Sequence, residues 1–141
     1  MTKIFIDTDA LIALNDASDL LHNQAVDILT KIDRRRILPY LSTNILLEVL
    51  TLISQRVSKA KALRLLDEFR AGEYVIVHPG ERVVDKAEEI FRSVKSKNVS
   101  YSDCMSFAIM QDNNIEWVFS FDVHFKKQGF KRVGIEGFPA Q

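Results

Sequence analysis

The alternation of short apolar runs with longer amphipathic segments constrains the fold more than any other feature of the sequence. Residues 3–6 (KIFI) and 117–121 (WVFSF) are nearly continuous apolar runs, which are typical of strands buried on both faces. Between them, apolar side chains recur at helical spacing, for example at Leu21, Ala25, Ile28, Leu29 and Ile32. The alternation predicts an α/β domain with a mainly parallel sheet and helices on both of its faces.

The same patterns place the individual elements. Four to five strands are expected, over residues 3–6, 37–41, 74–77, 117–121 and 131–133. Helices are expected after Asp7 and over residues 20–32, 43–55, 58–71, 81–95 and 103–112. We expect the arginines 34–36 to close the helix before them, where cations interact favourably with the helix dipole. Ser102 is expected to cap the last helix, and Pro39 indicates a strand end or an edge.

Composition narrows the class of protein. The 141 residues are 47% hydrophobic and 27% charged, with a net charge of zero, so overall charge does not hold this chain to nucleic acid. The lone Cys104 excludes an intramolecular disulfide and suits a reducing cytosol. No signal peptide is recognised, and no apolar stretch is long enough to span a bilayer. We expect a single soluble domain over residues 1–141, located in the cytoplasm, with no membrane partner.

Acidic side chains follow two of the predicted strands. Asp7 comes directly after the first strand, and Asp122 comes directly after the run at 117–121. Because ligands gather at the carboxyl ends of parallel strands, both carboxylates are candidates for one site. Asp also favours turns and caps, so each residue taken alone is equally compatible with a structural role.

Two helical acids add to this pair. Glu48 lies in the apolar stretch 45–50 (ILLEVL), where an ionised carboxylate needs a partner, a metal or water. The alternative is a solvated stripe made by Asn44, Glu48, Thr51 and Gln55. Asp103 stands in the first turn of its helix, where the dipole alone would favour a negative charge. Both residues therefore also have an ordinary structural explanation.

The combination of the four acids favours a metal-dependent reaction. Hydrolysis of a phosphodiester needs an activated water and an offset for developing charge, and Mg²⁺ or Mn²⁺ bound by carboxylates supplies both. The histidines His22, His78 and His124 have no zinc-ligand spacing. We interpret them as structural or surface residues, although His124 is close enough to Asp122 to line a cleft.

Four segments, taken in order, resemble the PIN domain. They are IFIDTDALIAL at the start, NILLEVLTLI in the middle, SYSDCMSFAIM at 100–110 and FSFDVHF at 119–125, and they look especially like PIN-domain toxins of the VapC type. The resemblance implies that an acidic quartet holds one or two divalent metals: Asp7, Glu48, Asp103 and Asp122. Thr8 and Ser120 fall where the family often has a hydroxyl beside the metal. Asp9, expected to cap a helix from Ala10, is placed outside the direct ligands.

The resemblance also implies an activity and partners. It implies an endoribonuclease that hydrolyses RNA without a covalent nucleophile, a homodimer, and a small antitoxin whose tail enters the active cleft. Basic clusters are candidate phosphate contacts, at residues 34–36, at Arg56, Lys59, Lys61 and Arg64, and at Lys126 and Lys127. Which of these clusters binds RNA does not follow from the sequence.

Parts of the sequence also fit three other kinds of domain. Asp7-Thr8-Asp9 also fits the start of haloacid-dehalogenase-type phosphatases, with Asp7 as the covalent nucleophile, but Leu11 stands where that family has Thr or Val. A phospho-receiver domain would need an acceptor Asp after the strand at 37–41, which leads to Ser and Thr instead. A non-catalytic interaction domain on the same fold has no reason to retain four clustered acids.

Overall fold

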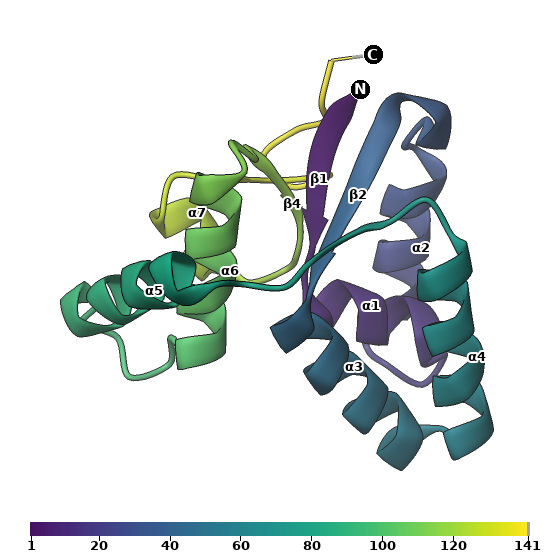
Figure 1. Ribbon diagram of the computed structural model, residues 1–141. Helices are drawn as coiled ribbons and strands as arrows, with labels where there is room; N and C mark the ends of the chain where they lie inside the picture. Colours follow the sequence, from purple (N-terminus) through teal and green to yellow (C-terminus); the bar gives the residue numbers. More distant parts are fainter. Residues whose placement is uncertain (141) are drawn as a thin grey trace.

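A computed structural model describes residues 1–140 of the chain, so residue 141 of the expected 1–141 domain lies outside the described residues. It contains one five-stranded sheet in the order β3-β2-β1-β4-β5, and all four strand pairings are parallel. The predicted α/β class and parallel sheet are therefore confirmed. Figure 1 shows α5, α6 and α7 on one side of the sheet and α2 on the other.

The elements follow the predicted order closely. The strands are β1 (Thr2–Ile6), β2 (Ile37–Ser42), β3 (Val75–Val77), β4 (Trp117–Phe119) and β5 (Lys131–Arg132). The helices are α1 (Thr8–Asn15), α2 (His22–Thr30), α3 (Thr43–Arg56), α4 (Lys59–Ala71), α5 (Glu81–Ser93), α6 (Tyr101–Asp112) and α7 (Val123–Lys127). Within the described part of the chain, no helix is long and apolar enough to cross a bilayer.

The predictions made at the ends of α2, α6 and β4 are wrong. The arginines 34–36 do not close the preceding helix, which ends at Thr30; they form a separate 3-10 turn because the Asp33 side chain accepts a hydrogen bond from the Arg35 N–H. The last long helix is capped by Ser100 instead of Ser102. The strand β4 ends at Phe119 instead of 121, and the short helix α7 that follows was not predicted.

Contrary to the prediction, Pro39 lies neither at a strand end nor on an edge strand but within β2, between β1 and β3. The pairing of β2 with β3 begins only at Tyr40, while Pro39 pairs with Ile4 of β1. At Pro39 the strand therefore has one paired neighbour, which is the condition that a residue without an N–H requires.

Successive residues of the central strands point to opposite faces of the sheet, and both faces are buried. Ile4 and Phe119 pack with residues of α1 and α2, whereas Phe5 and Val118 pack with the larger cluster that includes α3 and α6. Each fully buried side chain of this size contributes about 1.5–3 kcal/mol to folding. The two-sided core confirms the prediction that helices cover both faces.

The strand order reverses at β1. The chain passes from β1 to β2 and β3 on one side and then returns to β4 and β5 on the other. A crevice forms at such a switch point, outside the carboxyl ends of the strands. Asp7 and Asp122 follow β1 and β4 at this place.

Candidate active site

At the carboxyl ends of β1 and β4, Ser120 connects Asp7 with Asp122, and all three residues were predicted to lie at the site. The Ser120 hydroxyl donates to Asp7 Oδ2 at 2.8 Å and accepts from the Asp122 backbone N–H at 3.1 Å. Ser120 is 1% exposed, so its hydroxyl is available only to the groups packed around it. The Asp7 N–H also donates to the Phe119 carbonyl, 3.0 Å away. The two strand ends are therefore locked together, with both carboxylates at the same edge of the sheet.

Asp122 is held from its other side by the helix that it starts. Its Oδ1 accepts from the His124 backbone N–H at 2.8 Å, which makes Asp122 the N-cap of α7. The His124 ring Nδ1 lies 2.7 Å from the same oxygen. Helix α7 is anchored by Phe125, whose ring packs edge-on against Phe107 of α6 at 4.9 Å between centroids. His124 thus supports Asp122 directly.

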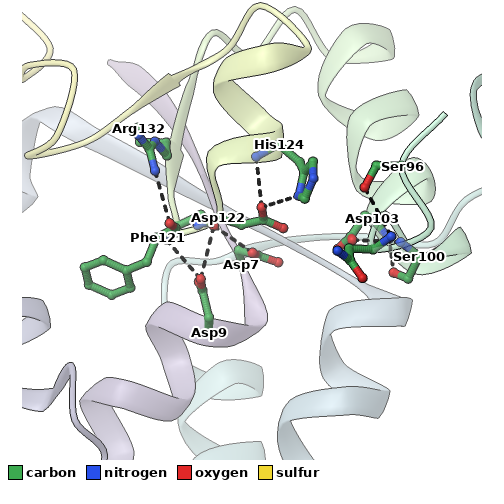
Figure 2. A network of polar contacts seen from close by, with 11 residues as sticks. Asp7, Asp9, Ser96, Ser100, Asp103, Phe121, Asp122, His124 and Arg132 are labelled. Carbon is green, nitrogen blue, oxygen red and sulfur yellow. Dashed lines mark hydrogen bonds and ion pairs between the residues drawn. The ribbon is translucent and has the colours of Figure 1, made fainter. Parts of the chain in front are cut away.

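Asp9 does not cap α1, contrary to the prediction, because the helix already begins at Thr8 with Asp7 in the capping position. Asp9 instead reaches across to the β4 end, where its Oδ2 accepts from the Phe121 N–H at 3.0 Å and from Ser120 at 3.4 Å. Its Oδ1 is buried and accepts no hydrogen bond from the described residues. Figure 2 shows Asp9 below Asp7 and Asp122 in this network.

The two helical acids reach the same place from α3 and α6. The Thr8 hydroxyl donates to Glu48 Oε2 at 2.6 Å, which joins α1 to α3. Asp103 takes part in a reciprocal capping box: its N–H donates to the Ser100 hydroxyl at 2.9 Å, and its Oδ2 accepts from the Ser100 N–H at 2.9 Å. Each carboxylate is thus oriented through one of its oxygens.

Asn44 fastens α3 to α6 between these acids. Its amide donates to the carbonyl and hydroxyl of Ser102, each at 3.1 Å, and to Ser106 Oγ at 3.2 Å, and it accepts from the Ser42 hydroxyl. Asn44 is engaged in the interior and Glu48 accepts from Thr8, so these two do not belong to a solvated stripe, whereas its other expected members, Thr51 and Gln55, are exposed.

One cavity of about 310 Å³ collects the acidic side chains. Those that line it are Asp7, Asp9, Asp19, Glu48, Asp103 and Asp122. Thr8 and Arg56 also line it. The Arg56 guanidinium Nη1 lies 3.7 Å from Asp19 Oδ2. The structure therefore brings all four predicted acids to one cavity, with Thr8 beside them and Ser120 beneath.

Sequence reasoning missed Asp19 and placed Arg56 only in a general basic cluster. The spacing contained a signal, since Glu48, Leu52 and Arg56 are four residues apart on α3 and all three line the cavity. Asp19 had no comparable signal because it lies between α1 and α2.

Burial, with a smaller contribution from neighbouring negative charges, raises the pKa of three carboxyl groups in the cavity. Burial raises the pKa of Asp7 well above its ordinary value, and the Asp9 charge raises it further. Burial raises the pKa of Asp9 to about 6. Burial also raises the pKa of Asp103, and the negative charges of Asp122 and Glu48 raise it further. These are the shifts expected of like charges that share a partly dry cavity.

The donor set fits a hard divalent cation. All the acidic ligands offer carboxylate oxygens, which Mg²⁺ and Mn²⁺ prefer, and the buried, unpartnered Asp9 Oδ1 marks excess negative charge. In the conformation described, residues 1–140 contain no group of three His, Cys, Asp or Glu side chains assembled as an ion site. The residues therefore fit a divalent cation by the chemistry of their oxygen donors and by their negative charge.

Comparison with known families decides the classification. The PIN domain model matches residues 4–131. The chain belongs to the PIN domain family. This membership does not favour the haloacid-dehalogenase alternative. No match was found among curated proteins.

Solved structures share the PIN domain fold. The chain is similar to VapC20 of Mycobacterium tuberculosis, described as a sarcin-ricin loop cleaving toxin, with a TM-score of 0.81 and 24% identity over 91% of this chain and 96% of the other. It is similar to FitAcB of Neisseria gonorrhoeae, with a TM-score of 0.66 and 17% identity over 93% and 96%. For VapBC2 of Rickettsia felis, described as bound to a DNA fragment from their promoter, the TM-score is 0.64 and the identity 12%, over 98% and 100%. At these identities the likeness concerns the fold.

Proposed function

We propose that this PIN domain is a divalent-metal-dependent endoribonuclease and the toxin of a type II toxin–antitoxin pair. One observation carries the proposal: Asp7, Glu48, Asp103 and Asp122, from four different elements, line a single cavity at the switch point of the sheet. The similarity to VapC20, a described sarcin-ricin loop cleaving toxin, supports RNA as the substrate.

In this proposal the four carboxylates hold Mg²⁺ or Mn²⁺, which supplies an activated water and offsets charge on the phosphate. The chain's own residues fix the geometry of that site. Ser120 sets the separation of Asp7 from the start of α7, and Thr8 orients Glu48. The Ser100 cap does the same for Asp103. Hydrogen-bonded supports of this kind typically affect metal affinity or activity by about 10–100-fold.

We propose two binding partners for this chain, a small antitoxin and a second copy of the chain itself. The likeness in fold to the VapC20 toxin and to VapBC2, described as bound to a DNA fragment from their promoter, supports a small antitoxin as the partner of this chain. We also propose a homodimer, since α3 and α4 expose Leu47 and Leu63 at 66% and 49%. The single buried Cys104 is compatible with a cytoplasmic location.

The test of catalysis is RNA cleavage by the four conservative variants Asp7→Asn, Glu48→Gln, Asp103→Asn and Asp122→Asn at saturating Mn²⁺. Each deletes a charge and nearly preserves shape, so each is expected to remove nearly all cleavage. Asp27→Asn is the matched control, because Asp27 is 60% exposed and pairs only with Lys31 on the surface. Three variants that kept more than about a tenth of the wild-type rate, a loss below ~1.4 kcal/mol, would refute the assignment.

A further inference from the structure

A second cavity is linked to the acidic cavity through His124. It has a volume of about 210 Å³ and lies between α7 and the segment that joins α5 to α6. Its lining includes Lys95, Ser96, Val99, His124, Lys127 and Gln128, and we call it the lysine cavity. His124 is the link, since it lines the lysine cavity and contacts Asp122, which lines the acidic cavity.

Each wall of the lysine cavity is connected to a residue that orients a carboxylate of the acidic cavity. On one wall, the His124 ring and backbone N–H hold Asp122 Oδ1 at 2.7 and 2.8 Å. The other wall is the segment of Lys95 and Ser96, which runs on to Ser100, the residue that caps Asp103. Figure 2 shows His124 beside Asp122, and Ser96 with Ser100 around Asp103. A ligand that spans both cavities would therefore pass directly over His124.

The two cavities carry opposite charge. The acidic cavity is lined by six carboxylates and one arginine, whereas the lysine cavity is lined by two lysines and no acid. Lys95 and Lys127 are exposed, and neither forms an ion pair within residues 1–140. An RNA strand has a phosphate on each side of the bond to be cut, and each needs a cation that an acidic site cannot supply.

The remaining basic clusters are less well placed. The arginines 34–36 precede β2 and so lie at the amino ends of the strands, opposite the site, and Arg35 and Arg36 are paired with Asp33. Lys59 lines a different cavity, between α3 and α4. Arg56 lies inside the acidic cavity itself. Of the residues in these clusters, Lys127 is the one that lines the lysine cavity, next to His124.

The geometry points to the lysine cavity as the subsite for the phosphate of the nucleotide adjacent to the scissile bond in single-stranded RNA. The inference rests on the proposed ribonuclease function and names a substrate contact for it. At roughly 30 Å³ per water molecule, the cavity has the space of about seven waters, enough for a phosphate and part of its ribose. Lys95 and Lys127 neutralise the phosphate while the scissile bond lies over the carboxylates.

The test compares two double variants with equal charge change. Lys95→Ala/Lys127→Ala removes the lysine cavity's cations, and Lys86→Ala/Lys97→Ala removes two exposed lysines that neither line it nor belong to a candidate basic cluster. Binding of a fluorescent single-stranded RNA is measured in EDTA over a salt series, and thermal melts check that both variants are folded. The cavity variant should bind about 10-fold more weakly, with a salt slope shallower by ~0.7–1.4, and the control variant should stay within about twofold.

Cleavage by the same proteins with Mn²⁺ separates binding from chemistry. The cavity variant should show a KM about 10-fold higher with kcat nearly unchanged, because the lysines bind a phosphate that does not react. Equal weakening in both variants, no weakening in either, or a loss confined to kcat would overturn the inference. Discrimination seen with polyglutamate but not with RNA would overturn it in favour of an acidic peptide. A wild-type protein that cleaves no RNA would instead refute the proposed function.

Discussion

Replacing Asp9 by Asn should stabilise the metal-free protein at neutral pH. The pKa of the Asp9 carboxyl rises from 3.8 to about 6 on folding, chiefly because of burial. A shift of about two units corresponds to roughly 3 kcal/mol of unfavourable free energy once the group is ionised in both states. Asn carries no charge, and its side-chain oxygen can still accept from the Phe121 N–H, as Asp9 Oδ2 does at 3.0 Å.

The direction of the pH dependence follows from proton binding. Between pH 3.8 and 6 the folded protein holds a proton on Asp9 that the unfolded chain has released. Raised pH therefore lowers the stability of the wild type through this window, and the full penalty is present above pH 6. The Asn variant lacks this loss. Its advantage should be about 1–3 kcal/mol at pH 7.5, after the cost of burying an amide N–H₂, and well under 1 kcal/mol near pH 4.

Thermal melts in EDTA at the two pH values measure this difference. For a chain of this length, 1 kcal/mol shifts Tm by about 4 °C, so the expected gain at pH 7.5 is roughly 4–12 °C. Asp27→Asn is the control, with a change near zero at both pH values because its carboxylate is exposed. An Asp9→Asn protein that melts below the wild type at pH 7.5, or differs from it equally at both pH values, would refute the reasoning.

Other variants test the supports of the site. Asp9→Asn should also keep RNA cleavage within about tenfold of the wild type, since Asp9 is placed outside the direct ligands; a loss as large as that of Asp7→Asn would make it a ligand. Ser120→Ala leaves Asp7 Oδ2 without its hydrogen bond and should slow cleavage about 10–100-fold. Ser18→Ala removes an exposed hydroxyl that donates to Asp16, away from the acidic cavity, and should leave the rate unchanged. Phe125→Ala removes the fully buried anchor of α7 and should cost about 3–5 kcal/mol in chemical denaturation; a loss under ~1 kcal/mol would contradict the packing described.

The sequence was sufficient to predict that the acidic side chains lie close together, because the topology of a parallel sheet determines where they lie. Once the strands are parallel, Asp7 and Asp122 must follow strands that end at one edge of the sheet. Glu48 could be predicted because a carboxylate within an apolar helical stretch needs a polar partner. Their proximity in the structure agrees with that expectation, while their roles as metal ligands remain a prediction.

Helix α7, the Ser100 cap and the lysine cavity could not be predicted, because the periodicity of the sequence carries no information on them. Helix α7 has only five residues, too few to show a helical pattern, so the capping role of Asp122 was missed. Ser100 and Ser102 both precede Asp103, and only the backbone geometry shows which one caps. The lysine cavity joins Lys95 to Lys127, which are far apart in the chain and are brought together by the packing of α7 on α6 through Phe125 and Phe107.

Direct titration of Mn²⁺ tests the central claim, that the four carboxylates form one cation site. Free Mn²⁺ is followed by electron paramagnetic resonance with the wild type, the four conservative variants and Asp27→Asn. We expect saturable binding by the wild type and by Asp27→Asn, and an affinity at least about 10-fold weaker in each of Asp7→Asn, Glu48→Gln, Asp103→Asn and Asp122→Asn. Equal affinity for Mn²⁺ in the wild type and all four variants would contradict the account.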